Sequence, residues 1–418
     1  MQHLIVGAGP AGVHAAETLR RLDPDAGILL LSGEAEPPYS RMAIPYLLSR
    51  HIDEAGTWLR PSPEHFQRHR IDVRHGLVER IDSTHNRIHL NDGSRLDYDR
   101  LLLATGASPR QPPVAGVELP GVLPCWTLEQ ARAIARRLQP DLPVVLMGAG
   151  FIACILLEAL LRRGARVTIV EREPHMVPRM MNPTAASMLK RWVEAKGARV
   201  LTGHAVELIE PNGDGLRVCL DHGEPLEARL VIPAAGVSPN IGFLRDSGIG
   251  LDQGIVVDRH LRTNIDNIFA AGDVAQGPDF SSGGFQVQAI QPTAVEHGRI
   301  AATNMTRDGA LCHAGSLNMN VLDTLGLIST SFGNWRGAPD GEQVELLDEA
   351  GWRYLNLQFD GDHLTGASSL GHSDHIGVAR GLIQGRVALG EWKTRLLREP
   401  TRLMEAWLAR SLAAAPSG

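Results

Sequence analysis

One glycine pattern occurs twice in this chain of 418 residues, each time between a short apolar run and a stretch with helical periodicity. The first copy, GAGPAG, follows the apolar residues 3–6 and spans Gly7 to Gly12. The second copy, GAGFIA, follows residues 144–147 and spans Gly148 to Ala153. A G-x-G-x-x-G/A turn between a buried strand and a helix is the phosphate-binding turn of a βαβ unit that holds a dinucleotide. The two copies therefore predict two nucleotide sites in one chain.

Each small residue of the pattern has a physical role. Gly7 permits the tight turn, Gly9 lets the backbone approach a pyrophosphate, and Gly12 lets the helix pack on the strand. The N-terminus of the following helix offers unpaired N–H groups and positive potential to the phosphates. The predicted contacts are Gly7, Gly9, Pro10, Ala11 and Gly12 in the first copy and Gly148, Gly150, Phe151 and Ile152 in the second.

An acidic residue follows the second apolar strand of each unit. Glu34 comes after residues 28–31, and Glu171 ends the run 166–170. Such a carboxylate accepts hydrogen bonds from ribose hydroxyls, and it repels the 2′-phosphate that distinguishes NADPH from NADH. Glu171 thus favours NADH, while its neighbour Arg172 can reach a phosphate and keeps NADPH open.

The composition argues against several classes of protein. With 43% hydrophobic and 21% charged residues the chain is not of the disordered type. A net charge of -6 and a pI of about 6.3 disfavour nucleic-acid binding. Four scattered cysteines without a C-x-x-C motif indicate reduced thiols and a cytoplasmic protein, not a disulfide scaffold or an iron–sulfur cluster. The apolar stretch 144–161 imitates a membrane span, but the second glycine unit accounts for it, so we predict no membrane segment.

Three further strand ends carry small or acidic residues. Residues 98–103 lead into Ala104-Thr105-Gly106, residues 230–235 lead into Gly236, and residues 263–271 lead into Gly272-Asp273. Together with the two glycine turns, these motifs resemble the two-dinucleotide-binding-domain flavoproteins, the FAD/NAD-linked pyridine nucleotide-disulfide oxidoreductases. The resemblance implies FAD on the first unit and NAD(P)H on the second, with Ala104, Thr105, Gly106, Gly236 and Gly272 among the cofactor contacts.

The resemblance also assigns roles near the flavin. Asp273 is expected to bond the ribityl chain of FAD. The helix from about Pro292, preceded by Ile290, is expected to point its N-terminus at the N1/O2 side of the flavin, where the reduced ring carries negative charge. Arg41 lies in the segment PYSRMAIPY (38–46), which is similar to a segment of rubredoxin, ferredoxin and nitrite reductase flavoproteins, and it is a further expected FAD contact.

The implied architecture is of the α/β class, with two nested Rossmann-like domains. The predicted FAD domain is 1–111 and 237–310, and the predicted NAD(P)H domain is 112–236. Residues 311–418 are predicted to form a C-terminal α+β domain that caps the molecule or builds a partner surface. Alternating residues in 317–322 and 327–332, and the run 352–359, indicate strands, and helix is predicted from Gly385 onward.

Two departures from the pattern of relatives involve three positions. Met42 stands where coenzyme A disulfide reductases and NADH oxidases carry a reactive cysteine, and a thioether cannot form a thiolate. Tyr46 and Ile155 stand where several relatives pair a lysine with a glutamate near the flavin. The first change argues against thiol-based reduction, and the second argues against the usual nicotinamide stacking.

No metal site is predicted, because His372 and His375 form an H-x-x-H pair without a third ligand. No catalytic side chain is assigned, because hydride transfer needs none. The sequence predicts that electrons pass from NADH through FAD to an acceptor, a small redox protein of the rubredoxin or ferredoxin type. The open alternatives are an NADH oxidase, a coenzyme A disulfide reductase-like enzyme, and a flavin-bearing assembly or sensor subunit without turnover. Assembly as a homodimer is open too.

Overall fold

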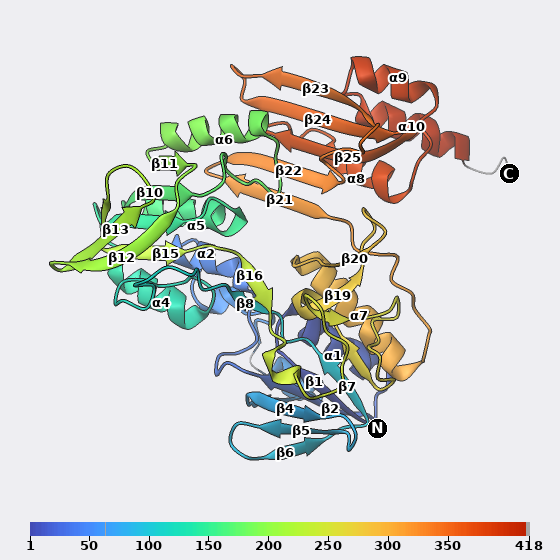
Figure 1. The fold of residues 1–418 in the computed structure, drawn as a ribbon. Helices are drawn as coiled ribbons and strands as arrows, with labels where there is room; N and C mark the ends of the chain where they lie inside the picture. Colours follow the sequence, from blue (N-terminus) through green and yellow to red (C-terminus); the bar gives the residue numbers. More distant parts are fainter. Residues whose placement is uncertain (63, 415–418) are drawn as a thin grey trace. The chain divides into compact units, whose positions relative to one another are not determined.

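The computed structural model describes residues 1–62 and 64–414 and divides into two compact units (Figure 1). Unit 1 comprises Met1–Pro109 and Val237–Ser316, and unit 2 comprises Arg110–Gly236 and Leu317–Gly418. The chain therefore leaves unit 1 after Pro109 and returns to it at Val237. Unit 2 groups residues 110–236 with the C-terminal residues, so the three-domain division stays a proposal.

Unit 1 is built on a five-stranded parallel sheet. The apolar runs of the sequence become strands that are buried on both faces, as parallel strands between helices require. Because the strands are parallel, their carboxyl ends meet at one edge. The strand order is β18 (Ile268–Ala270), β7 (Arg100–Leu103), β1 (Gln2–Val6), β2 (Gly27–Ser32) and β3 (Asp72–His75).

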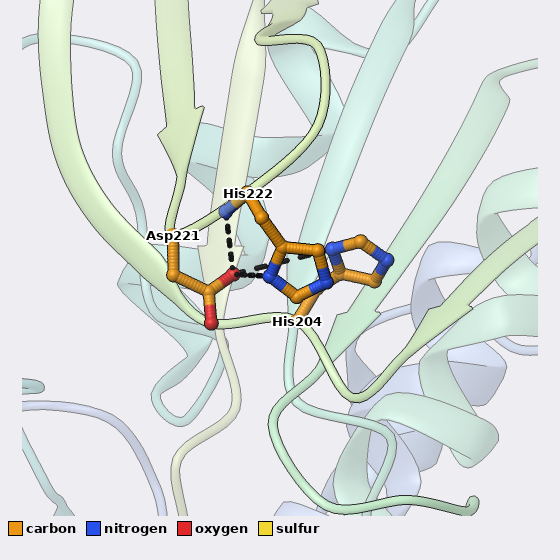
Figure 2. A group of neighbouring side chains, drawn as sticks. All are labelled: His204, Asp221 and His222. Carbon is orange, nitrogen blue, oxygen red and sulfur yellow. Dashed lines mark hydrogen bonds and ion pairs between the residues drawn. The ribbon is translucent and has the colours of Figure 1, made fainter.

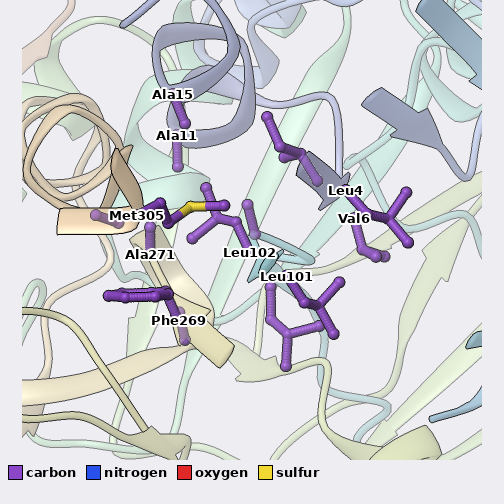
Figure 3. Packing of buried hydrophobic residues seen from close by; sticks show 14 of the residues in the cluster. Leu4, Val6, Ala11, Ala15, Leu101, Leu102, Phe269, Ala271 and Met305 are labelled. Atoms are coloured by element: carbon purple, nitrogen blue, oxygen red, sulfur yellow. The ribbon is translucent and has the colours of Figure 1, made fainter. Parts of the chain in front are cut away.

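Two helices, α1 (Pro10–Leu22) and α7 (Gln291–Thr306), pack tightly together in this unit. A Cβ atom on Gly298 of α7 would lie only 2.2 Å from the carbonyl oxygen of Ala11, so the contact depends on that glycine. Figure 3 shows the core between helices and sheet, with Ala15 from α1, Met305 from α7 and Leu102 from β7.

The remaining elements of unit 1 are short. Antiparallel pairing joins β4, β5 and β6 in one sheet and β8 with β16, whereas β19 pairs parallel with β17 and antiparallel with β20. Their bounds are β4 (Val78–Asp82), β5 (Arg87–Leu90), β6 (Arg95–Asp97), β8 (Ala107–Pro109), β16 (Val237–Pro239), β17 (Ile255–Val256), β19 (Ala275–Pro278), β20 (Phe285–Val287), α2 (Ile44–Leu48) and α3 (His65–Arg68).

Unit 2 contains the second parallel sheet. Its strand order is β11 (Arg199–Thr202), β10 (Arg166–Glu171), β9 (Pro143–Met147) and β15 (Leu230–Pro233). The helices are α4 (Leu128–Arg137), α5 (Phe151–Arg162) and α6 (Pro183–Ala195). A three-stranded antiparallel sheet of β12 (Val206–Asn212), β13 (Gly215–Leu220) and β14 (Leu226–Ala228) completes this part. Both parallel sheets confirm the predicted α/β class.

The C-terminal part of unit 2 is a five-stranded antiparallel sheet with three helices. The strand order is β21 (Met319–Thr324), β22 (Leu327–Gly333), β25 (His363–Leu370), β24 (Arg353–Asp360) and β23 (Glu342–Asp348). The helices are α8 (Ile376–Gln384), α9 (Glu391–Arg398) and α10 (Leu403–Ala414). Hydrogen bonds fasten it to the nucleotide-binding part: Asn182 Nδ2 donates to Tyr354 Oη at 2.5 Å, and Trp192 Nε1 donates to the Thr324 carbonyl at 3.1 Å.

The predicted C-terminal strands are confirmed. Helix is present in the predicted region as α9 and α10, but the predicted start at Gly385 is wrong. Gly385 ends helix α8, which the sequence reading missed, and Arg386 has a positive φ of 44°. Helix α9 begins only at Glu391, after Gly390 with a φ of 59°. Positive φ values interrupt helices. Within residues 1–62 and 64–414, every helix is too short or too polar to cross a bilayer.

Candidate functional site

In unit 1 the sequence motifs converge at one edge of the parallel sheet. Gly7 follows β1, Ala104 follows β7, and Gly272 follows β18, and these three strands are neighbours. Gly7 has a φ of +113°, and a Cβ there would lie 2.1 Å from the Ala104 carbonyl oxygen. A Cβ on Gly272 would lie 3.1 Å from that of Ala11. Glycine is therefore required at these crossings, which bring together segments distant in the sequence.

The first glycine turn leaves an open cradle at the start of α1. A Cβ on Gly12 would lie 1.9 Å from the Gly7 carbonyl oxygen, so Gly12 serves helix packing. A Cβ on Gly9 would meet nothing within 4 Å, so Gly9 faces open space. Helix α1 has no side-chain cap and no acidic residue in its first turn, which leaves its N–H groups available. This arrangement fits the pyrophosphate of a dinucleotide.

A second uncapped helix start lies at the same edge. Ile290 is the N-cap residue of α7 and makes no side-chain cap bond, and the first turn of α7 lacks acidic residues. A Cβ on Gly272 would lie 3.4 Å from that of Ala294, which places Asp273 beside this turn. Ser40 Oγ donates to the side-chain oxygen of Gln291 at 2.9 Å and ties the 38–46 segment to the helix. The geometry suits the stabilisation of negative charge.

The predicted ribose ligand Glu34 is held by two side chains. Its carboxylate accepts hydrogen bonds from Tyr39 Oη and from Arg41 Nη2, each at 2.6 Å. Burial raises the pKa of the Asp273 carboxyl to about 6, and the nearby positive charge of Arg41 partly opposes that shift. Arg41 thus connects the two acidic residues. The sequence reading did not single out Tyr39, because no motif marked its contact with Glu34.

A cavity of about 710 Å³ opens beside β2 and β3, and its lining includes Ser32 at the carboxyl end of β2 and residues along the length of β3. Glu34, Trp58, Arg60 and Asp72 are among the residues that line it. The indole N–H of Trp58 is buried without a hydrogen-bond partner in the described chain, so a donor stands ready for a ligand atom. The size and the unpaired donor fit the adenosine half of FAD. Trp58 was missed because no sequence motif marks it.

The predicted A-T-G contacts are fixed by one asparagine. Thr105 Oγ1 donates to the Asn240 carbonyl at 3.1 Å, and Asn240 Nδ2 donates to the Thr105 carbonyl at 2.8 Å. The Asn240 N–H also donates to the Gly106 carbonyl at 2.9 Å. Gly106 has a φ of +66° and faces open space.

In unit 2 the second glycine turn has the same arrangement as the first, but the approach at its first glycine is less close. Gly148 has a φ of +105°, and a Cβ there would lie 2.8 Å from the Ala234 carbonyl oxygen. Gly150 faces open space at the start of α5, where Phe151 and Ile152 form an uncapped first turn without an acidic residue. Gly236, at φ +90°, is open too. These residues form a second cradle for phosphates.

The carboxylate of Glu171 is hydrogen-bonded to the second glycine turn. Its side chain is buried, and its two carboxylate oxygens accept hydrogen bonds from the N–H groups of Ala149 at 2.6 Å and Glu173 at 2.8 Å. Arg172 is largely exposed, and its guanidinium lies 3.3 Å from the Glu173 carboxylate. The charge of Glu171 therefore sits directly at the glycine turn.

The positions that depart from relatives are exposed or half-buried. Met42 and Tyr46 are exposed, and Ile155 is half-buried on α5. All four cysteines are free thiols, and burial raises the pKa of Cys125 and Cys154 to about 12, which disfavours their thiolates.

Comparison with models of known protein families shows which family the chain belongs to. The model of the pyridine nucleotide-disulphide oxidoreductases matches residues 1–298. The chain belongs to this family. Family members bind FAD and use NAD(P)H, so the chain is an NAD(P)H-dependent FAD oxidoreductase. The individual site residues remain predictions, and the geometry above shows that those of each unit lie together.

Similar proteins carry more specific names. The chain is 32% identical over 402 residues to "NADH-dependent phenylglyoxylate dehydrogenase subunit epsilon" of Aromatoleum evansii, covering 96% of this chain and 95% of that protein. It is 33% identical over 311 residues to rhodocoxin reductase of Rhodococcus erythropolis, covering 73% and 72%. The crystal structure of a ferredoxin reductase from Rhodopseudomonas palustris is similar with a TM-score of 0.84 and 27% identity, covering 91% of this chain and 93% of that one.

Proposed function

We propose that this flavoprotein passes electrons from NADH through FAD to a small redox protein of the rubredoxin or ferredoxin type. The observation that carries the proposal is the pair of open glycine cradles, one in each unit. The names of the rhodocoxin reductase and ferredoxin reductase relatives support the choice of acceptor.

The residues of unit 1 would hold FAD. The N–H groups at the start of α1 take the pyrophosphate beside Gly9, and Glu34 with Tyr39 and Arg41 takes the adenosine ribose. Asp273 and the N-terminus of α7 lie where a ribityl chain and the flavin edge would be bound. When bound, FAD supplies the redox chemistry, accepting a hydride and releasing electrons to the acceptor. The protein's part is to bind and orient, and to provide positive potential at α7.

The residues of unit 2 would hold NADH. Gly150 and the first turn of α5 take the pyrophosphate, and the buried carboxylate of Glu171 lies at the turn that the adenosine ribose approaches. A 2′-phosphate would meet that negative charge, so the site favours NADH. The largely exposed guanidinium of Arg172 would attract a 2′-phosphate, so it opposes this preference for NADH.

A second candidate function has its own support. The relative that is named as a dehydrogenase subunit matches 96% of this chain, including the C-terminal antiparallel sheet, whereas the rhodocoxin reductase match covers 73%. This chain would then be the NAD-linked flavin subunit of a larger dehydrogenase. Electrons would run from the partner subunit through FAD to NAD⁺.

An anaerobic titration tests the shared core of both candidates. The purified protein is loaded with FAD and titrated with NADH and with NADPH while the visible flavin band is recorded. We expect NADH to bleach the band stoichiometrically and NADPH to require higher concentrations. Protein that refuses FAD, or a bound flavin that NADH leaves oxidised, would refute the proposal.

The direction of flow separates the two candidates. NADH-driven reduction of added rubredoxin or ferredoxin supports the reductase. NAD⁺ reduction by a chemically reduced ferredoxin, faster than the reverse reaction under matched driving force, supports the dehydrogenase subunit. Oxygen uptake that accounts for all the NADH consumed without any carrier, one O2 per NADH with H2O2 as product or one O2 per two NADH with water as product, would point instead to an oxidase.

A further inference from the structure

Three side chains with metal-binding atoms meet in unit 2, away from the glycine turn itself. His204 follows β11, and Asp221 and His222 follow β13, so two separate strand ends contribute (Figure 2). One ligand atom from each residue lies within 4.8 Å of those of the other two. Two imidazole nitrogens and a carboxylate oxygen form a donor set that suits divalent transition metals.

The backbone fixes these residues in place. The Asp221 N–H donates to the Ala205 carbonyl at 2.9 Å, and Asp221 Oδ1 accepts from the Ala205 N–H at 3.1 Å. The His204 N–H donates to the Glu171 carbonyl at 3.0 Å. The cluster is therefore anchored to the end of β10 and to the start of β12, so the Cα positions of its members are set before any ligand arrives.

The side-chain nitrogens of both histidines lie near the carboxylate of Asp221. His222 Nδ1 lies 2.9 Å and His204 Nδ1 lies 4.0 Å from the same oxygen of Asp221. The two rings are stacked with their centroids 4.0 Å apart, and Figure 2 shows both beside the carboxylate. His204 Nδ1 is buried and has no hydrogen-bond partner among the described residues, whereas His222 is 61% exposed. A buried nitrogen without a partner is unfavourable unless a ligand satisfies it.

We propose that His204, Asp221 and His222 bind a divalent transition-metal ion of the Zn²⁺ type. Three protein ligands leave at least one position for water on the solvent side, where His222 and Asp221 are accessible. Metal–donor bonds of about 2.0–2.2 Å place tetrahedral donors roughly 3.3–3.5 Å apart. His204 Nδ1, at 4.0 Å from the Asp221 carboxylate, must therefore move closer, and His222 Nδ1, at 2.9 Å, must give up its hydrogen bond and move slightly away. Rotation of the exposed His222 ring can release that hydrogen bond. The site is independent of the proposed electron-transfer function.

The sequence predicts no metal site, and His372 and His375 are the only candidate ligands that its motifs mark. This cluster is not marked, because its ligands come from two strand ends and follow no short spacing motif. A simpler account is also testable: His222 and Asp221 can form an ordinary surface ion pair on which His204 stacks. The two accounts differ in whether removing His204 changes the affinity for metal.

The test uses untagged, FAD-loaded protein that has been stripped of metals and is titrated with Zn²⁺ by calorimetry. The variants are His204→Gln, Asp221→Asn and His222→Gln. The control is His85→Gln, because His85 is an exposed histidine paired with Asp82 at 3.0 Å without a second histidine. We expect one saturable Zn²⁺ site in the wild-type protein and in the control, and a loss of more than about tenfold in affinity in each cluster variant.

Flavin absorbance and the thermal midpoint without Zn²⁺ verify that each variant is folded. If His204→Gln fails that check, His204→Phe decides, because it keeps an aromatic ring stacked on His222 and removes both ring nitrogens. Zn²⁺ is also expected to raise the melting temperature of the wild-type protein and not that of the folded cluster variants. Equal Zn²⁺ affinity in wild type and cluster variants, or no saturable binding in the wild type, overturns the proposal.

Discussion

The two glycine turns perform the same task with different parts. In unit 1 the third small residue is Gly12, whose Cβ would lie 1.9 Å from the Gly7 carbonyl oxygen, whereas in unit 2 that place is taken by Ala153, whose side chain is buried. Glu34 is held by the side chains of Tyr39 and Arg41. Glu171 instead accepts hydrogen bonds from backbone N–H groups, one in the glycine turn at Ala149 and one in its own loop at Glu173.

This difference suggests how each ligand is treated. The first turn is packed more closely, and its acidic residue belongs to a side-chain network that reaches Arg41 and, through its charge, Asp273. Such a network suits a cofactor that stays bound. The second turn is held by the Glu171 carboxylate, which accepts hydrogen bonds from two backbone N–H groups, so its shape does not depend on a ligand. That arrangement suits a nucleotide that enters and leaves in each cycle.

The largest expected effect comes from Gly12→Ala. The added methyl group would collide with the Gly7 carbonyl oxygen, a backbone atom that cannot move without disturbing β1. We expect a destabilisation of about 3 kcal/mol or more and loss of FAD from the purified protein. Denaturant unfolding and the ratio of flavin to protein absorbance measure the two effects.

Ala153→Gly is the matched change in the second turn. It removes a methyl group from a helix and should cost only about 1 kcal/mol, with FAD retained. A Gly12→Ala protein that retains FAD and wild-type stability would show that the packing difference between the turns has no consequence.

The second largest effect separates the two ligands. Gly9 and Gly150 both have a φ of -79°, which any residue adopts, and both face open space. Gly9→Val is expected to fold normally but to bind FAD about a hundredfold more weakly, because the side chain occupies the pyrophosphate position. Gly150→Val is expected to keep FAD and to lose reduction by NADH to a similar degree. Flavin content and stopped-flow reduction report these outcomes, and an exchange of the two phenotypes would reverse the assignment of the cofactors.

The sequence predicted most of the nucleotide-binding scaffold because glycines mark positions where the backbone itself makes the contact. Gly7, Gly12 and Gly148 each lie at a close approach that a Cβ would block, so the pattern of residue types encodes the geometry. The α/β class and the order of motifs follow from the same signal.

Contacts between side chains far apart in the sequence could not be predicted in this way. Tyr39 on Glu34, Trp58 in the cavity and Asn240 on Thr105 depend on tertiary packing and follow no spacing rule. The start of the C-terminal helical region was predicted wrongly, and helix α8 was not predicted. Gly385 was read as the start of a helix, although glycine is common at helix ends, and it ends α8.

A pH measurement sharpens the comparison further, because the buried Asp273 carboxyl lies beside the first turn. Burial raises its pKa from 3.8 to about 6, so the folded state binds more protons than the unfolded state between these values. Stability of the FAD-free protein is therefore expected to fall as the pH rises from about 4 to about 6, on the order of 2 kcal/mol. Asp273→Asn should remove that component, and unfolding free energies of both proteins across this range measure it. Parallel pH profiles for variant and wild type would contradict the expectation.

The smallest expected effect concerns the choice between NADH and NADPH in the second turn. Glu171→Gln removes the negative charge that a 2′-phosphate would meet, while one side-chain oxygen remains to accept the hydrogen bond from Ala149. We expect the ratio of kcat/KM for NADPH to that for NADH to rise about tenfold, which corresponds to about 1.4 kcal/mol. Arg172→Gln is the opposite test. It removes the exposed guanidinium next in sequence to Glu171, which would attract that phosphate, so it should lower the same ratio. A ratio that stays constant in Glu171→Gln would mean that this carboxylate only supports the loop, and that the preference for NADH must come from residues other than the one that the sequence marked.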